Sequence, residues 1–447
     1  MTNIMKFKTF ILIQAILILI NVEVICQENQ NLKSVSSPDS LSLKAIIEEI
    51  IKTHPTIKNA EEVLNSADAR IELAKTGYYP QVDMTANYSN QGPVIKLTIP
   101  SMGTFELFPE NSYSAAINYR QIIYDFGRTR QNLNIEKESK LIGEQVLEQV
   151  KQKIALTAVN NFYTLAFLQE AIKIKDEELI TLNSHLRYVE TMKLTGSATD
   201  YQILTTKVKI SIVESQKVDL LSTQTIQQSY LNCLVGNAES VKPVVREELY
   251  VIAPVINQDS IYSYAFHNRD EIRMNQERTS IAGLKYDLIR YMNRPVINFL
   301  ATGGAKNGYV PNLNQIRPNY MVGIGISVPI FDGMKTKYNL QQAESAINTI
   351  GFEAENTKRN ITSEVNEAEA YMKTAIQKIK QSELQLEQAL KAYSLAETSF
   401  NSGIITNLEL LDANTVLSES KLMLLKARID YAASVYKLKT ALGERLY

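Results

Sequence analysis

The chain has 447 residues, of which 47 are Lys or Arg and 48 are Asp or Glu, so its formal net charge is -1. This balance gives no reason to expect a nucleic acid as a partner. With 3 His and 2 Cys, a metal site built from those residues is not expected either. Because 45% of the residues are hydrophobic and 21% are charged, a globally disordered chain is excluded.

Residues 1–26 have the pattern of a secretory signal peptide. Lys6 and Lys8 precede a mostly apolar run, 10–20, which is shorter than the roughly 20 residues that a membrane-spanning helix needs. We therefore expect an exported protein that is cleaved after Cys26, with lipidation of Cys26 as the alternative. Residues 27–40 are polar and rich in serine, which predicts a flexible leader.

Two copies of one sequence pattern follow, at about 41–236 and 259–443. Glycines 127, 143, 196 and 236 of the first copy recur as glycines 333, 351, 403 and 443 of the second. Repeats this long indicate a duplicated domain, since solenoid units are about 20–50 residues long. Residues 237–258 are then a linker between the copies, and 444–447 form a short tail. Each copy is predicted to contain a helix, two strands, a very long helix, a turn and a helix.

Four segments alternate between apolar and polar residues and are predicted to be strands, at about 81–90, 113–124, 296–303 and 319–330. In the first of them Val82, Met84 and Tyr88 share one face. The segments have roughly the 9–12 residues that a tilted membrane strand requires. Polar loops are expected between the strands of each pair, at 90–112 and 304–318. Because four strands cannot close a barrel and an open edge is not tolerated in lipid, the chain must oligomerise, and three copies with 12 strands are favoured over two with eight.

The long helices are predicted to fold back as antiparallel coiled-coil hairpins. Between Arg128 and Thr195 only one glycine interrupts a composition that favours helix. Gly196 and Gly403 are expected to end the long helices in left-handed conformation. The return helices can be capped by Thr199 or Asp200 in the first copy and by Thr406 or Asn407 in the second.

The order of these motifs resembles the TolC-type outer membrane factor family over nearly the whole mature chain. The resemblance rests on two strand-to-helix junctions and two hairpin tips: Tyr124-Asp125-Phe126-Gly127-Arg128, Ile330-Phe331-Asp332-Gly333, Gly196-Ser197-Ala198-Thr199 and Gly403-Ile404-Ile405-Thr406. It implies a mostly α chain with membrane β-strands, in which a homotrimer forms a 12-stranded β-barrel in outer membrane lipid, continued by a periplasmic α-helical barrel.

The function that this resemblance implies is a passive exit duct of a tripartite efflux pump or type I secretion system. Its partners would be a periplasmic adaptor protein, which contacts the two hairpin tips, and an inner membrane transporter. The alternative is a periplasmic coiled-coil scaffold or adaptor without a pore, which the four alternating strands disfavour. The exported substrate is not specified by the sequence.

The resemblance also implies that Glu409 and Asp412, just past the second tip, line the periplasmic gate. The alternative is that acids in the first turns of a helix favour its positive dipole end and stay solvated. Where the family often has an aromatic hydroxyl and an arginine at the closed tip, this chain has Phe400 and Ile405, so closure is expected to depend on packing.

No residue set indicates catalysis or a cofactor. Asp125 and Asp332, beside Gly127 and Gly333, lie at strand-to-helix junctions and are expected to cap helices rather than act as an acid pair. His54, His185 and His267 are expected to be solvated or packed. We therefore predict that the protein is not an enzyme.

Overall fold

The computed structural model describes residues 42–100, 103–236 and 260–447. The predicted signal peptide with Cys26, the 27–40 leader and the 237–258 linker lie outside these residues.

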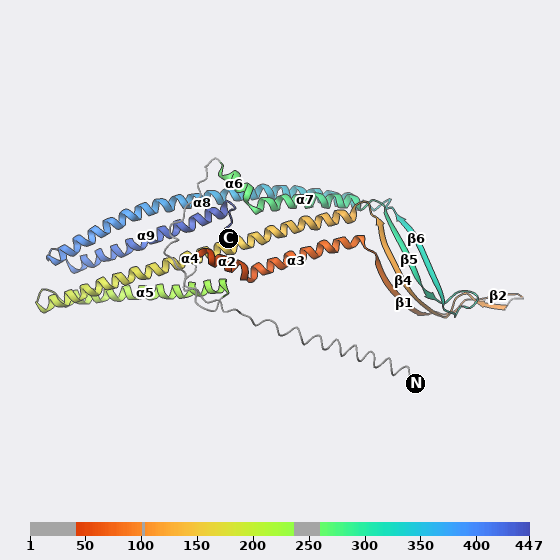
Figure 1. Ribbon diagram of the computed structural model, residues 1–447, viewed down its shortest axis with the longest axis horizontal. Coiled ribbons are helices and arrows are strands. Elements are labelled where there is room, and N and C mark those ends of the chain that lie inside the picture. Colours follow the sequence, from red (N-terminus) through yellow and green to blue (C-terminus); the bar gives the residue numbers. More distant parts are fainter. Residues whose placement is uncertain (1–41, 101–102, 237–259) are drawn as a thin grey trace, which may run out of the picture. The chain divides into compact units, whose positions relative to one another are not determined.

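Four strands form one antiparallel sheet in the order β1 (Gln81–Asn90), β4 (Asn111–Tyr124), β5 (Val296–Lys306) and β6 (Arg317–Ser327) (Figure 1). The two central strands come from different halves of the chain, so the pairing of β4 with β5 joins the two copies. The outer strands β1 and β6 each have one edge without a partner strand in this sheet. Such an edge presents unpaired backbone N–H and C=O groups.

The strand register aligns the apolar residues of all four strands on one face of the sheet. Two successive rows across the sheet are Val82–Tyr119–Ala301–Val322 and Met84–Ile117–Gly303–Tyr320, whereas the row between them on the opposite face is Asp83–Asn118–Thr302–Met321. The apolar face is exposed, with Met84 at 72% and Ile324 at 68% of full exposure. The predicted alternation is therefore confirmed.

Two features of the strands differ from the predictions. The segment expected to be a polar loop, 90–112, contains a further hairpin of β2 (Lys96–Ile99) and β3 (Gly103–Glu106). Strands of four residues are too short to show a clear period in the sequence. In addition, β6 ends at Ser327 rather than near residue 330, shortly before Pro329, whose nitrogen has no hydrogen to donate to a neighbouring strand.

The helices form two long antiparallel hairpins and shorter segments beside them, and the predicted hairpins are confirmed. The hairpins are α4 (Arg128–Leu194) with α5 (Asp200–Val235), and α8 (Lys335–Asn401) with α9 (Asn407–Ala441). The shorter helices are α2 (Leu43–Thr53), α3 (Pro55–Lys75), the 3₁₀ turn η1 (Thr76–Tyr78), α6 (Ile261–Asn268) and α7 (Asp270–Tyr291). None of the helices within the described ranges combines the length and apolar character needed to cross a membrane.

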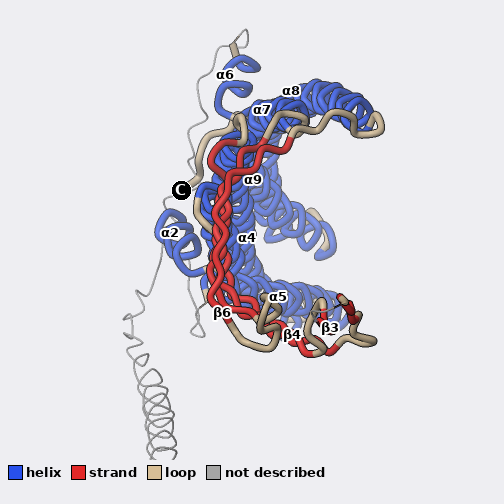
Figure 2. The backbone as a smooth tube through the Cα atoms, turned by 90° about the vertical axis from the view of Figure 1, so that its right-hand side faces the viewer, coloured by secondary structure: helices blue, strands red, loops and turns tan. Residues whose placement is uncertain are grey.

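Each long helix has a different neighbour along each half of its length. The sheet-side half of α4 packs against α3 and α7, and its tip-side half packs against α5 and α9; α8 packs in turn against α7 and α9 (Figure 1). Viewed at right angles to Figure 1, these helices follow one curved layer (Figure 2). The largest buried cluster lies where α2 packs on the middle of α4, with Ile46 and Ile50 against Phe162 and Tyr163.

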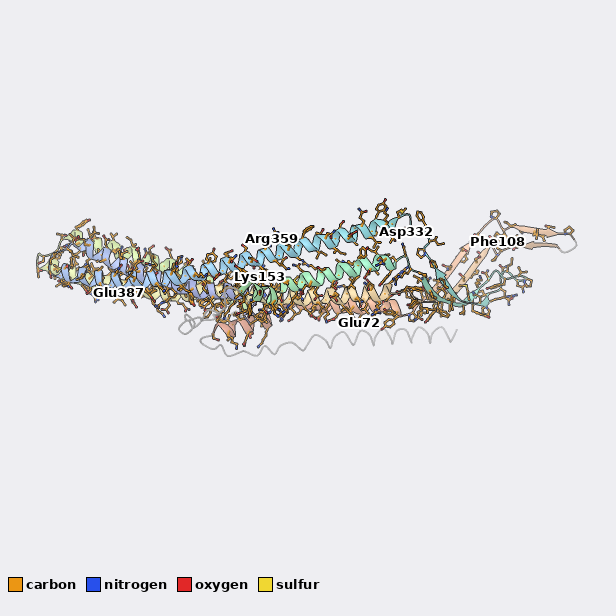
Figure 3. The ribbon with its side chains drawn as sticks, turned by 90° about the horizontal axis from the view of Figure 1, so that it is seen from above. Glu72, Phe108, Lys153, Asp332, Arg359 and Glu387 are labelled. Atoms are coloured by element: carbon orange, nitrogen blue, oxygen red, sulfur yellow. The ribbon has the colours of Figure 1, made fainter. Side chains whose placement is uncertain are left out.

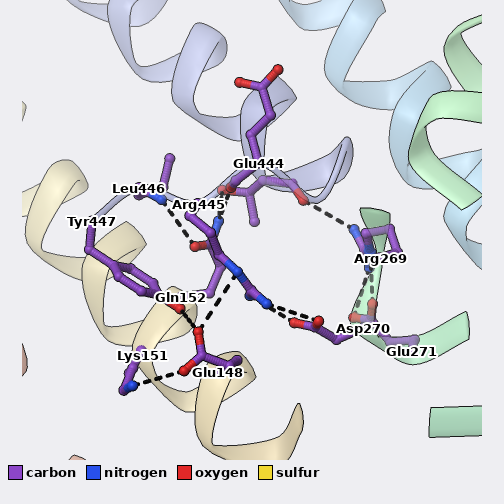
Figure 4. Close-up of polar contacts among 11 residues, drawn as sticks. Glu148, Lys151, Gln152, Arg269, Asp270, Glu271, Glu444, Arg445, Leu446 and Tyr447 are labelled. Atoms are coloured by element: carbon purple, nitrogen blue, oxygen red, sulfur yellow. Dashed lines mark hydrogen bonds and ion pairs between the residues drawn. The ribbon is translucent and has the colours of Figure 1, made fainter. Parts of the chain in front are cut away.

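The last four residues bind the end of α9 to α4 and α7 (Figure 4). Arg445 donates two hydrogen bonds, of 2.7 and 2.9 Å, to the carboxylate of Asp270 at the start of α7. Gln152 of α4 donates to the carbonyl oxygen of Glu444 and accepts from the backbone N–H of Leu446. The tail is therefore held by side chains of both copies.

Candidate functional site

The two hairpin tips have the same local geometry. Gly196 and Gly403 have φ angles of 75° and 71°, in the left-handed region that glycine adopts without a steric penalty. The next residue in each tip donates its backbone N–H to the carbonyl oxygen five residues earlier, which closes the end of the long helix: Ser197 to Met192, and Ile404 to Ser399, both at 2.9 Å. The predicted glycine ends are therefore confirmed.

A threonine is the N-cap residue of both return helices. The side chains of Thr199 and Thr406 accept hydrogen bonds from the backbone N–H groups of Gln202 and Glu409, both at 3.3 Å. The side chains of those two residues accept in return from the threonine N–H groups, which completes a capping box in each copy. Of the caps that the sequence left open, the structure uses the threonine in both copies.

Most of the predicted tip residues are exposed, and two are half-buried. Gly196, Ser197, Thr199 and Ile404 are exposed, whereas Ala198 and Ile405 pack against a buried cluster of Val189, Phe400 and Leu410. This cluster joins α4, α8 and α9. Phe400 is 5% exposed, so this side chain, which has no hydroxyl group, packs inside the cluster.

A polar contact missed by sequence reasoning lies beside this cluster. Asn407, at the first residue of α9, is 3% exposed, and its Oδ1 lies 2.6 Å from Nε2 of His185 on α4. Its Nδ2 donates to the carbonyl oxygen of Gln202 and to the hydroxyls of Thr205 and Thr206, each at 3.2 Å. One amide thus connects the start of α9 to both helices of the first hairpin, so packing is not the only link between the tips.

The direction of the His185 contact follows from the donors available. Asn407 uses its Nδ2 on α5, so Oδ1 accepts and His185 Nε2 carries the donated hydrogen. Burial lowers the pKa of His185, and this effect exceeds the opposing influences of the Asn407 hydrogen bond and the charge of Glu397. The imidazole is therefore packed and neutral at neutral pH.

The two acids assigned to the gate are both exposed on the first turns of α9. The carboxylate of Glu409 accepts hydrogen bonds from the backbone N–H of Thr406 at 2.7 Å and from its hydroxyl at 2.9 Å. These two bonds lower the pKa of Glu409. Glu409 therefore completes the capping box of α9, a role that neither the gate interpretation nor its solvated alternative specified. Asp412 lies three residues further along the same helix.

Both junction acids bond to the first turn of the helix that follows them. Asp125 accepts hydrogen bonds from the N–H and hydroxyl groups of Thr129, at 2.7 and 2.5 Å, and from the N–H of Gly127 at 3.0 Å. Asp332, labelled in Figure 3 where the chain leaves the sheet for α8, accepts from the N–H of Thr336 at 2.8 Å and from its hydroxyl. Gly127 and Gly333, with φ angles of 100° and 69°, allow the chain to turn there.

The capping bonds keep both junction acids ionised. For Asp125, burial opposes the charge, but the hydrogen bonds from Thr129, Gly127 and Arg128 outweigh it and lower the pKa. For Asp332, the hydroxyl and N–H groups of Thr336 lower the pKa directly.

Arg128 has a role that the sequence did not reveal. Its guanidinium donates to the carbonyl oxygens of Tyr291, Met292 and Arg294 at the end of α7, at 2.9, 2.7 and 2.5 Å. These carbonyls lie at or just beyond the last residue of α7, where no further turn of helix supplies donors. Arg294 donates in return to the carbonyl oxygen of Phe126 at 3.0 Å. The first junction is therefore bonded to the chain that enters β5.

The described residues show little chemistry beyond these contacts. No group of three or more His, Cys, Asp or Glu side chains among them is placed to hold a metal ion. The most displaced acid is Glu277 on α7, whose pKa is raised to about 7, chiefly by a hydrogen bond with Glu138 of α4 and further by burial. The arrangement is suited to holding two hairpins and a sheet in place.

The model of the family described as "Outer membrane efflux protein" matches residues 46–237 and 261–444. The chain belongs to this family of outer membrane channel proteins. Among curated relatives, the alkaline protease secretion protein AprF of Pseudomonas aeruginosa is 23% identical over 348 residues, which cover 74% of this chain and 70% of AprF. The outer membrane protein TolC of Vibrio cholerae is 22% identical over 420 residues, which cover 90% of each chain.

Solved structures share the fold. A crystal structure of CusC has a TM-score of 0.75 and 19% identity, and the match covers 91% of this chain and 92% of CusC. The outer membrane protein VceC of Vibrio cholerae has a TM-score of 0.74 and 18% identity, with 91% and 97% of the two chains covered. The predicted TolC-type fold is therefore confirmed, and the function of the chain is that of an outer membrane efflux channel.

Proposed function

We propose that three copies of this chain form the exit duct of a tripartite efflux pump or a type I secretion system. The open sheet with its exposed apolar face carries this proposal. In lipid, each unpaired backbone group at the edges of β1 and β6 would cost several kcal/mol. Pairing β6 of one copy with β1 of the next removes both edges. Three copies then give 12 strands and an interior wider than that of an eight-stranded barrel.

The helical hairpins continue this duct on the side of the sheet where both junctions lie. Their exposed tips, at Gly196–Thr199 and Gly403–Thr406, are the surfaces we assign to a periplasmic adaptor protein, which would connect the duct to an inner membrane transporter. The duct itself is passive. AprF is named for secretion of a protease and CusC for efflux of cations, so this architecture alone does not define the cargo.

We assign the selectivity of the periplasmic entrance to Glu409 and Asp412. In a trimer the two positions supply six carboxylates around the axis, and clustered carboxylates attract cations. The lowered pKa of Glu409 keeps its charge in place in mildly acidic surroundings. In this arrangement Glu409 has two functions, because the same carboxylate caps α9.

The experiment that separates the duct from a scaffold is native mass spectrometry of protein extracted from outer membranes. We expect a particle of three chains in the outer membrane fraction. A monomer recovered from the soluble periplasmic fraction would instead support the coiled-coil scaffold or adaptor without a pore.

A further inference from the structure

A groove runs along one side of α7, between α4 and α8, on the half of the long helices that adjoins the sheet. It consists of two hollows with volumes of about 540 and 280 Å³, which share the side chain of Arg278. The larger hollow has apolar walls that include Ile281 and Ile289 of α7, whereas polar side chains dominate the smaller one. Small-molecule sites typically have volumes of roughly 300–1,000 Å³, so the groove is large enough for such a ligand.

A buried hydrogen-bond donor in the smaller hollow has no acceptor. Asn275 is only 6% exposed, and its Nδ2 atom makes no hydrogen bond within the described structure. A buried polar N–H without a partner is rare and destabilises the fold. Asn275 therefore indicates that an acceptor from outside the chain binds at this end of the groove.

The charges along the groove favour an anion. Arg269, at the polar end, is already paired with Glu271 at 2.9 Å and with Glu364 at 2.8 Å. Arg278 and Lys285 lie seven residues apart on the groove side of α7, and neither forms an ion pair within the described ranges. One guanidinium thus serves both carboxylates at the polar end, while Arg278 and Lys285 have no carboxylate partner among the described residues, so the groove as a whole carries more positive than negative groups.

We infer that this groove binds an amphiphilic organic anion with a carboxylate head and an apolar body. The head lies at the polar end, where it accepts hydrogen bonds from Asn275 Nδ2 and Arg278. The body lies along Ile281 and Ile289, and Lys285 adds positive charge at the rim. The site is separate from the hairpin tips and the acidic entrance.

The test uses 6-bromo-2-naphthoate as the anionic probe and the corresponding bromonaphthyl-methylammonium ion as its cationic match. Binding to the full chain in lipid nanodiscs is measured by calorimetry, with empty nanodiscs as the reference for partitioning into lipid. We expect one saturable site per chain for the anion and none for the cation. Equal binding of the two probes would overturn the inference.

Variants locate the site. Arg278→Gln combined with Lys285→Gln should weaken binding of the anion at least tenfold, whereas Arg290→Gln, on the same helix but outside the groove, should leave it within twofold. Asn275→Leu should weaken binding at least fivefold and also raise the thermal midpoint, because it removes the unpartnered amide. A purely structural Asn275 would lower the midpoint when replaced.

Anomalous scattering from bromine gives a second, independent readout. A bromine peak over α7, between α4 and α8, supports the site, and a peak elsewhere, or binding that all variants retain, contradicts it. Calorimetry does not depend on conduction. Failure of the groove and failure of the duct can therefore be told apart. In the first case the protein conducts without binding the probe, and in the second it binds the probe without conducting.

Discussion

His185 Nε2 and Asn407 Oδ1 lie 2.6 Å apart although the two residues are 222 positions apart in the chain. This hydrogen bond connects α4 to the first residue of α9. The buried ring of Phe400 on α8 lies edge-on against the same imidazole. The polar and apolar links between the two hairpins of one chain therefore meet at His185. Separation of α4 from α8 and α9 at the tips of one chain must break both links.

Replacing Asn407 should loosen the tips. Asn407→Ala leaves the buried Nε2–H of His185 without an acceptor, and an unsatisfied buried group costs about 1–3 kcal/mol. We expect faster hydrogen exchange of backbone amides in 183–192 and 405–412, measured by mass spectrometry. Asn414→Ala is the matched control, since Asn414 is a buried amide on the same helix whose Nδ2 has no partner. If the backbone amides of these segments were equally protected from exchange in Asn407→Ala and Asn414→Ala, the result would contradict a link through Asn407 and His185.

The junction acid Asp125 should contribute to stability through its cap. Asp125→Ala removes the acceptor for two backbone N–H groups at the start of α4, and loss of such a cap costs about 0.5–2 kcal/mol. The pKa of Asp125 is lowered in the folded protein, so its contribution is present above the ordinary pKa of 3.8 and is lost as the pH falls through the folded value. The free energy of unfolding, measured with denaturant, should therefore differ less between pH 7 and pH 3 for Asp125→Asn than for the unchanged protein.

The pair of Glu138 and Glu277 predicts the opposite pH dependence. Their hydrogen bond raises the pKa of Glu277 to about 7 from an ordinary value of 4.5. The proton bound by Glu277 therefore contributes to the free energy of unfolding. This contribution is full below pH 4.5 and is lost as the pH rises through about 7. Glu277→Gln keeps a donor but does not titrate, so its thermal midpoint should change less between pH 4.5 and 8. Glu353→Gln, an exposed acid on α8, should behave like the unchanged protein.

The tail should contribute to stability through Arg445. Arg445→Met leaves the Asp270 carboxylate, whose side chain is 7% exposed, without its ion-pair partner. Hydrogen bonds to charged groups contribute about 1.5–3 kcal/mol, and we expect a loss of this size in denaturant unfolding. Tyr447→Phe removes one hydrogen bond to Glu148 and should cost less. A larger effect of Tyr447→Phe would show that Asp270 does not depend on Arg445.

Local patterns predicted the fold well. Alternation in β1 and β6 and the glycines at the tips are visible in the sequence because each depends on residues close together in the chain. The capping role of Glu409 could also be predicted from the sequence, since Thr406 and Glu409 have the spacing of a capping box. The gate assignment of Glu409 came from the family resemblance, and its alternative was based only on the helix dipole, not on the capping box.

The missed contacts are those between distant residues. Arg128 bonds to carbonyl groups more than 160 residues away, and no local period marks such a partner. His185 and Asn407 were unremarkable as single polar residues on helices. Their pairing depends on how the two hairpins pack, which periodicity does not determine. The four-residue strands β2 and β3 were missed because they are shorter than the window in which alternation is recognisable.

The most direct test of the duct is single-channel recording of the purified protein in planar lipid bilayers. We predict small cation-selective currents, and a reduced preference for cations in the double variant Glu409→Gln/Asp412→Asn, which removes the carboxylates at both positions. Unchanged selectivity in that variant would place the entrance elsewhere along the duct. A folded trimer that inserts into the bilayer and carries no current under any applied voltage would contradict the duct itself.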